Sequence, residues 1–232
     1  MNNIKKEIIR YLEVFPPALE VFHQLLEIGN VYVMGGLLRE YKDHQKLIEL
    51  RDADFCLEIE RRDLWEQLLK KISYTTNRFG GYKLNCKGFI IDIWEIENTW
   101  AFRTGKVLAE KNEYFAKLPS TVFLNLDGLA YDLIHDEWND AIYQKAMENS
   151  ELDVVLEENP FVELNIVRAM VLQNKYKMTY SERLKRIILQ YVTEQQDWLK
   201  QLIDIQWKRY NYLVLNEAQI NMQLEELKNK PM

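Results

Sequence analysis

The chain has 232 residues, of which 47% are hydrophobic, and a formal net charge of −6. A chain of this length buries most of the apolar surface of its unfolded form and needs no disulfide framework, and its two cysteines and three histidines show no zinc-ligand spacing. No segment approaches the roughly 18 to 20 apolar residues of a membrane span, and the opening segment MNNIKKEIIRYLEVF lacks the apolar core of a signal peptide. We therefore expect a cytoplasmic protein with reduced cysteines and no membrane partner.

The charge is unevenly distributed along the chain. Residues 1–118 carry 18 basic and 18 acidic groups, residues 119–163 carry 1 and 11 (net −10), and residues 164–232 carry 11 and 7 (net +4). An acidic segment repels nucleic acid, whereas a basic one attracts a phosphate backbone. Solvated helix faces are the simpler explanation of both segments.

Two short amphipathic helices are predicted first, one ending before Pro16 and one ending at Gly29. A buried strand, VYVM, is expected next, followed by Gly35-Gly36 and a helix over LLREYKDH. A strand, a glycine pair and a helix form a geometry that accepts phosphate groups.

Apolar residues then alternate along a strand that begins near residue 52. The alternation places Ala53, Phe55, Leu57 and Ile59 on one face and Asp52, Asp54, Cys56 and Glu58 on the other. Both aspartates therefore point the same way. Carboxylates this close repel each other, and a bound metal ion would offset that repulsion.

A helix over RRDLWEQLLKKI and a β ribbon made of SYTT, YKLNC and GFIIDIWEI are expected next. The last of these segments is apolar on both faces, which is typical of a central strand, and Asp92 lies in its middle. An unpaired carboxylate there would cost several kcal/mol, so Asp92 either ionises beside a cation or stays protonated.

The rest of the chain is predicted to be mainly helical. STVFLNLDGLAYDLI forms another strand or turn, and helices are expected from Asn159-Pro160 to the end. A capping box of Thr179 and Glu182 is expected to open the helix RLKRIILQYV.

The order of these motifs carries a family resemblance. GG-x-x-R (Gly35, Gly36, Arg39) precedes D-x-D at the start of a strand, and a lone aspartate follows on a later strand. This order resembles the nucleotidyltransferase superfamily of DNA polymerase beta, most closely the head domain of tRNA CCA-adding enzymes and bacterial poly(A) polymerases. VYVMGGLLRE, NRFGGYKL, LDGLAYDL and NIVRAMVLQNKYKMTYSE are similar to successive segments of that family, over roughly residues 28 to 185.

The resemblance implies a fold and a reaction. The fold would be α+β, with a small mixed sheet flanked by helices as a head domain over residues 1–135 and a small helical domain over residues 136–232. The reaction would move a nucleoside monophosphate from a nucleoside triphosphate onto an RNA end, such as that of a tRNA, or onto another hydroxyl, with Mg or Mn as cofactor.

The resemblance also implies the roles of the site residues. Asp52 and Asp54 would hold two metal ions, and Asp92 would ligate the ion that activates the acceptor hydroxyl. Gly35 and Gly36 would let backbone N–H groups approach the β- and γ-phosphates. Arg39 would reach a phosphate oxygen or an acidic partner.

Other side chains near these strands have simpler explanations. Arg78, Lys83 and Arg103 could contact phosphates, but solvated side chains are the favoured interpretation. Trp94, Trp100 and Phe102 could stack on a base, but positions in the core are favoured.

The sequence departs from the family pattern at two motifs. The Arg-Asp pair that precedes the family's NALA segment is replaced by apolar residues around Val122 and Phe123, and the family's EDxxR motif is matched only by EENPFVELN, without its arginine. We therefore do not expect an ordinary CCA-adding enzyme. Two alternatives remain: the same chemistry on a protein or small-molecule acceptor, and a non-catalytic module that binds nucleotide or RNA.

Overall fold

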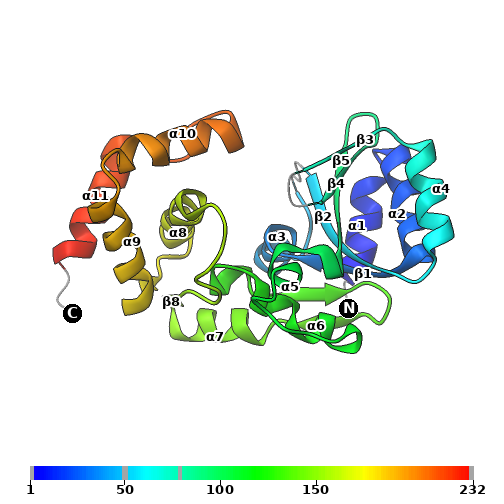
Figure 1. Ribbon diagram of the computed structural model, residues 1–232, viewed down its shortest axis with the longest axis horizontal. Coiled ribbons are helices and arrows are strands. Elements are labelled where there is room, and N and C mark those ends of the chain that lie inside the picture. The colour runs from blue at the N-terminus through cyan, green and yellow to red at the C-terminus, as the bar shows by residue number, and fades with distance from the viewer. Residues whose placement is uncertain (1–2, 49–51, 78–79, 230–232) are drawn as a thin grey trace. The chain divides into compact units, whose positions relative to one another are not determined.

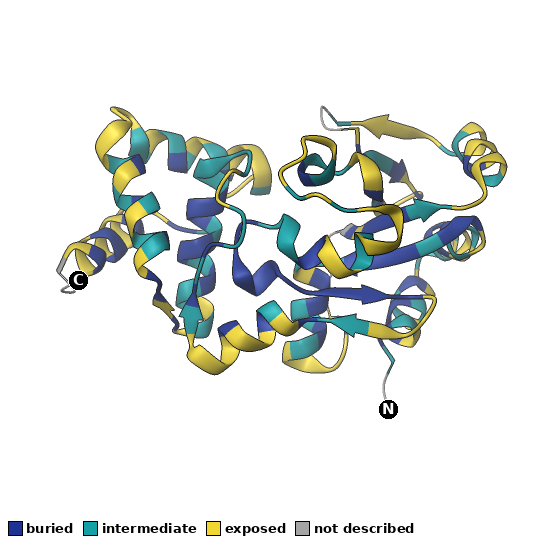
Figure 2. Ribbon diagram, turned by 60° about the horizontal axis from the view of Figure 1, so that its bottom comes forward, coloured by how far each residue is buried: buried dark blue, intermediate teal, exposed yellow. Residues whose placement is uncertain are grey.

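The computed structural model describes residues 3–48, 52–77 and 80–229. The chain divides into two compact units, Met1–Thr121 with Asp127–Ile142, and Val122–Leu126 with Tyr143–Met232. Each unit contains fully buried apolar residues, and the ribbon of Figure 2 is dark blue where residues are buried.

A seven-stranded mixed sheet forms the centre of the first unit, in the order β3-β4-β5-β2-β1-β6-β7. Its strands are β1 (Gly29–Met34), β2 (Asp52–Ile59), β3 (Tyr74–Thr76), β4 (Tyr82–Asn85), β5 (Ile90–Glu95), β6 (Ala130–Asp132) and β7 (Glu137–Asn139). β2 and β5 run parallel, and the other neighbouring strands run antiparallel. β5 is therefore an interior strand, as its apolar sequence predicts.

Helices cover both faces of this sheet. They are α1 (Ile4–Leu12), α2 (Pro16–Ile28), α3 (Gly36–His44), α4 (Arg62–Lys71), α5 (Trp100–Arg103) and α6 (Tyr114–Lys117). The Asn3 side chain caps α1 by accepting a hydrogen bond from Lys5 N, and Pro16 opens α2, because proline fits the first turn of a helix.

The two faces of the sheet follow the predicted alternation along β2. α1, α2 and α4 lie together against one face (Figure 1), where the ring of Phe22 lies 5.6 Å from that of Phe55. On the other face, Tyr32 and Cys56 belong to a buried cluster against which Phe102 and Phe115, of α5 and α6, pack.

The second unit is mainly helical. It contains most of α7 (Ala141–Asn149), then α8 (Val162–Tyr176), α9 (Glu182–Glu194), α10 (Trp198–Tyr210) and α11 (Glu217–Asn229), with a two-stranded parallel ladder of β8 (Glu151–Leu152) and β9 (Thr179–Tyr180). None of the described helices has the length and apolar character needed to cross a membrane.

The predicted fold class, an α+β sheet flanked by helices and followed by C-terminal helices, is confirmed. The predicted capping box is wrong. Ser181 caps α9, since its hydroxyl accepts a hydrogen bond from Leu184 N at 3.1 Å, while Thr179 belongs to β9.

Candidate active site

Two of the predicted carboxylates occupy paired positions on adjacent parallel strands. Asp54 of β2 is paired with Asp92 of β5, and Asp52 is paired with Ile90. Paired residues of neighbouring strands point to the same face of a sheet, so Asp54 and Asp92 share a face. The backbone of Asp52 opens β2, and its side chain lies outside the described part of the structure.

Asp92 forms an ion pair with a lysine of the neighbouring strand. Lys83 of β4 is paired with Asp92 in the antiparallel β4–β5 ladder, and its Nζ donates a hydrogen bond to Asp92 Oδ2. The Asp92 side chain is 13% exposed and that of Lys83 is 43% exposed. The structure thus places a cation beside Asp92, which is what the first of the two states expected from the sequence requires.

The face of β2 that carries the aspartates is exposed to solvent at Asp54 and buried two residues later, at Cys56. Asp54 is exposed, whereas Cys56 is buried and its Sγ lies 3.8 Å from Met34 Sδ. Burial, and then the charge of Asp54, raises the pKa of the Cys56 thiol to about 12. The thiol is therefore protonated at neutral pH and packs as an apolar group.

Oxygen ligands on one open face suit a hard divalent cation such as Mg²⁺. Among the described side chains no three or more histidines, cysteines, aspartates or glutamates form a cluster that could hold a metal ion. Asp54 and Asp92 supply two carboxylates of the expected set. The third, Asp52, precedes Asp54 by two positions, and its placement on the same face stays a prediction from the strand alternation in the sequence.

The glycine pair begins α3. Gly35 has φ +65° and ψ −125°, a conformation that residues with a side chain rarely adopt, and it is the N-cap of the helix. A Cβ at Gly36 would meet only Arg39 Nη2, at 3.8 Å. The turn therefore leaves open space beside the N-terminus of α3, where backbone N–H groups favour anions.

Arg39 already has an acidic partner. Its guanidinium forms an ion pair with Asp127, and the side chains are only 13% and 7% exposed. Asp127 Oδ1 also lies 3.9 Å from the position that a Cβ of Gly35 would occupy. Arg39 thus neutralises a buried carboxylate close to the glycine turn, which is the second of the two roles expected for it.

The aromatic side chains near the strands are structural, as the sequence favours. Trp94 and Phe102 pack against the buried cluster around Cys56, and a Cβ on Gly81 would come within 2.9 Å of the Trp94 ring. Arg103 is exposed near the Gly80 turn, and Arg78, considered from sequence as a possible phosphate contact, lies outside the described residues.

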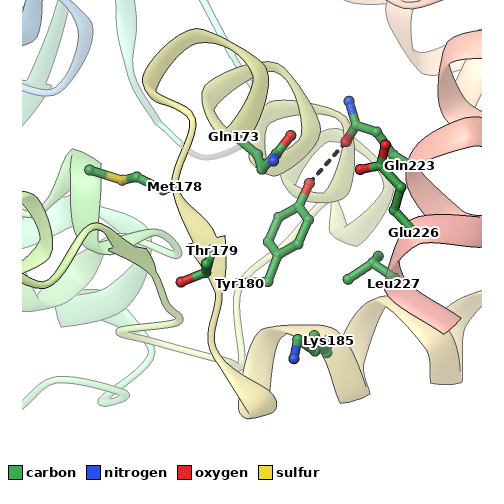
Figure 3. A pocket seen from close by; sticks show the side chains of 8 residues that line it. All are labelled: Gln173, Met178, Thr179, Tyr180, Lys185, Gln223, Glu226 and Leu227. Atoms are coloured by element: carbon green, nitrogen blue, oxygen red, sulfur yellow. Dashed lines mark hydrogen bonds between the residues drawn. The ribbon is translucent and has the colours of Figure 1, made fainter. Parts of the chain in front are cut away.

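A small cavity lies in the second unit (Figure 3). It has a volume of about 80 Å³, and its polar lining includes Tyr180, Gln223, Lys185 and Glu226. The Tyr180 hydroxyl donates a hydrogen bond to Gln223 Oε1 at 3.0 Å. The residues of the predicted site do not line this cavity.

Sequence reasoning missed two partners of the site. Lys83 was expected to be solvated or to contact a phosphate, and Asp127 was not considered. The loop between β4 and β5 contained a signal for Lys83. Lys87 and Gly88 form a two-residue hairpin loop with positive φ, and counting back from that loop pairs Lys83 with Asp92.

Comparisons with known proteins identify the fold. No family model matches the chain, and no curated protein matches it. Solved structures do match. A CCA-adding enzyme in complex with ATP is 19% identical, with a TM-score of 0.61 over 94% of this chain and 52% of that one. A Thermotoga maritima CCA-adding enzyme in complex with tRNA-CCA is 18% identical, with a TM-score of 0.62 over 92% of this chain and 51% of that one.

The chain spans about half the length of these structures. At such identity the likeness concerns the fold alone, and this chain shares its fold with these CCA-adding enzymes over more than nine tenths of its length. The resemblance found in the sequence is thereby confirmed for the fold.

Proposed function

We propose that this protein is a nucleotidyltransferase that uses Mg or Mn to move a nucleoside monophosphate from a nucleoside triphosphate onto an RNA end. The observation that carries the proposal is the pairing of Asp54 with Asp92 on adjacent parallel strands. This pairing occurs in a fold shared with CCA-adding enzymes whose structures contain ATP, CTP or tRNA. Residues 1–135 would form the catalytic head domain and residues 136–232 a helical domain.

Each residue of the site has a role in this proposal. Asp52, Asp54 and Asp92 would hold the metal ions, which when bound neutralise charge on the triphosphate and lower the pKa of the attacking hydroxyl. Lys83 would orient the Asp92 carboxylate through the hydrogen bond between its Nζ and Asp92 Oδ2. Gly35 and Gly36 would bring backbone N–H groups to the β- and γ-phosphates, and Arg39 removes the repulsion that Asp127 would otherwise exert there.

A protein or small-molecule acceptor is the alternative. Residues 119–163 carry 1 basic and 11 acidic groups, a charge that disfavours an RNA backbone. The basic segment 164–232 favours RNA, so the acceptor is the part of the proposal that experiment must decide first.

The test is incubation of the full chain with each α-labelled nucleoside triphosphate, Mg²⁺ or Mn²⁺, and total RNA, with RNA, protein and small-molecule products resolved for label. We expect label on RNA. Asp54→Asn and Asp92→Asn should each lower incorporation by at least about tenfold. Loss of an outer-shell partner of a metal site costs about 10- to 100-fold, and loss of a metal ligand should cost no less. Glu66→Gln, which removes an exposed carboxylate from α4, is the matched control and should leave incorporation unchanged.

Label on protein or on a small molecule, lost in the same variants, would keep the chemistry and replace the acceptor. Label that persists in Asp54→Asn would show that another site performs the transfer. A chain that binds triphosphate without transferring label to any acceptor would be a binding module.

A further inference from the structure

An aromatic and basic surface lies at the C-terminal end of α10. It consists of Trp207, Lys208, Arg209, Tyr210 and Tyr212, called here the α10 surface. Trp207 is 53% exposed and Tyr212 is 58% exposed, among the largest exposed fractions of the described apolar side chains. Burial in the core therefore does not explain these two rings.

The α10 surface has a rigid support. Gln206 is fully buried, and its Oε1 accepts hydrogen bonds from Val214 N at 3.0 Å and Leu215 N at 2.8 Å, while its Nε2 donates to Leu202 O at 3.0 Å. One side-chain amide thus joins the last turns of α10 to the loop that carries Tyr212. The exposed rings are presented on a fixed backbone.

Neighbouring contacts also order the surface. The ring centroids of Tyr210 and Tyr212 lie 6.2 Å apart, and the Arg209 guanidinium lies over the ring of Phe161, 4.4 Å from its centroid. These contacts order Tyr212 and Arg209 before a ligand binds, which lowers the entropy that these two side chains lose on binding.

The charge of the surface indicates the class of partner. Residues 198–216 carry three basic side chains and one acidic side chain, and Lys208 and Arg209 follow Trp207 directly. Exposed rings beside cations fit unpaired nucleic-acid bases, which stack on the rings while the cations meet the phosphates. An apolar protein partner fits less well, because the centres of protein interfaces are depleted of lysine.

We propose that the α10 surface binds single-stranded RNA, with bases stacked on Trp207 and Tyr212 and phosphates held by Lys208. The inference rests on the proposed function, since it places the acceptor of that reaction on the helical unit. It is also separable from catalysis, because binding can be measured in a chain that cannot transfer nucleotide.

The experiment measures fluorescence anisotropy of a labelled, mixed-sequence single-stranded RNA of about 12 nucleotides, a length within the site sizes of single-strand binders. All proteins carry Asp54→Asn, so that transfer does not alter the probe. We expect Trp207→Ala and Tyr212→Ala each to raise the Kd at least about fivefold, the lower limit for loss of one stacked base. Trp207→Phe should recover most of the affinity, and Met222→Ala, which removes an exposed apolar side chain of α11, should not change it.

Salt dependence tests the phosphate contact. Lys208→Gln should reduce the slope of log K against log salt by about 0.7, the value for one contact to a single strand. If Trp207→Ala and Tyr212→Ala bind RNA as tightly as the parent chain, which carries Asp54→Asn alone, the α10 surface does not bind RNA. The proposed nucleotidyl transfer would be unaffected by that result. A parent chain that does not bind RNA would overturn it as well, and label transfer by the wild-type chain to a different acceptor would then show that the chemistry stands without RNA.

Discussion

Lys83 meets Asp92 on the open face of the sheet, where the proposed reaction requires a metal ion. The ammonium and a divalent cation would therefore compete for the same carboxylate. Lys83→Met removes the competitor, so we expect the metal concentration for half-maximal activity to fall about two- to fivefold, the equivalent of a partly exposed ion pair of ~0.5–1 kcal/mol. A metal titration of nucleotidyl transfer measures this concentration.

The same variant should be less stable without metal, because Asp54 and Asp92 then repel each other with no ammonium beside them. Lys87→Met, in the neighbouring hairpin loop, is the control, since Lys87 is exposed and its backbone conformation is kept. A higher metal requirement in Lys83→Met would show that the ammonium assists the metal instead of competing with it.

Arg39 and Asp127 form the most buried ion pair around the candidate site. Arg39→Ala leaves a carboxylate in a poorly hydrated place, and we expect a loss of about 3–5 kcal/mol in the free energy of unfolding, measured with urea. Adding Asp127→Asn should restore at least about 1 kcal/mol, because a neutral amide costs less to bury. Additive losses in the double variant would show that the pair contributes no coupling energy.

The two glycines of the turn at the start of α3 differ in the backbone conformation that they adopt. Gly35 needs a positive φ, so Gly35→Ala should lower the free energy of unfolding by about 1–3 kcal/mol. Gly36 has no such demand, and its neighbourhood has room for a methyl group, so Gly36→Ala should change stability by less than about 0.5 kcal/mol.

If phosphates approach the backbone of this turn, Gly36→Ala should still weaken binding of a nucleoside triphosphate, since the methyl group occupies the space the phosphates need. Calorimetric titration with triphosphate and Mg²⁺ measures the affinity. Unchanged affinity in a stable Gly36→Ala protein would remove the turn from the proposed site.

The loop between β6 and β7 contains a pH-dependent contact. The Nδ1 of His135 lies 2.8 Å from Asp132 Oδ2, and this hydrogen bond, followed by the charge of Asp132, raises the pKa of His135 above 6.5. A raised pKa in the folded state means that the contact contributes its full stability below pH 6.5 and loses it as the pH rises through the folded-state pKa.

His135→Ala should therefore lower the melting temperature more at about pH 5.5 than at about pH 8.5, because the wild-type imidazole loses its charge as the pH rises. Thermal unfolding of both proteins at the two pH values measures the difference. A difference that is equal at both pH values would assign it to packing of the ring and not to its charge.

The local sequence pattern predicted the helices and strands better than it predicted which of them pair or contact each other. The alternation along β2 placed Asp54 on the polar face, and the isolated charge in β5 marked Asp92, because both signals depend on neighbours in the sequence. The parallel pairing of β2 with β5 joins residues nearly forty positions apart, and no local signal in the sequence predicts its register.

The errors have the same origin. Thr179 has the right spacing for a capping box, but its N–H donates to Ser150 O and the residue joins β9, so tertiary pairing overrode a local signal. The Arg39–Asp127 pair likewise connects α3 to a segment 88 positions later, and no local periodicity predicts such a contact.

At the scale of the whole molecule, the first unit contains the proposed carboxylate site and the second unit contains the proposed RNA-binding surface. RNA binding by the α10 surface is tested separately, in chains that carry Asp54→Asn. The carboxylate site depends on one claim, that the chain binds a metal ion and a nucleoside triphosphate at Asp54 and Asp92. This claim can be tested without knowledge of the acceptor, because any ligand that binds only the folded state raises the melting temperature.

The decisive measurement is the melting temperature of the wild type and of Asp54→Asn with and without Mn²⁺ or Mg²⁺, alone and with each nucleoside triphosphate. We predict that metal and at least one triphosphate together raise the melting temperature of the wild type, and that Asp54→Asn abolishes the rise. The variant without metal should melt at or above the wild type, because a repulsive charge has been removed. An equal rise in both proteins, or no rise in the wild type with any triphosphate, would contradict the account.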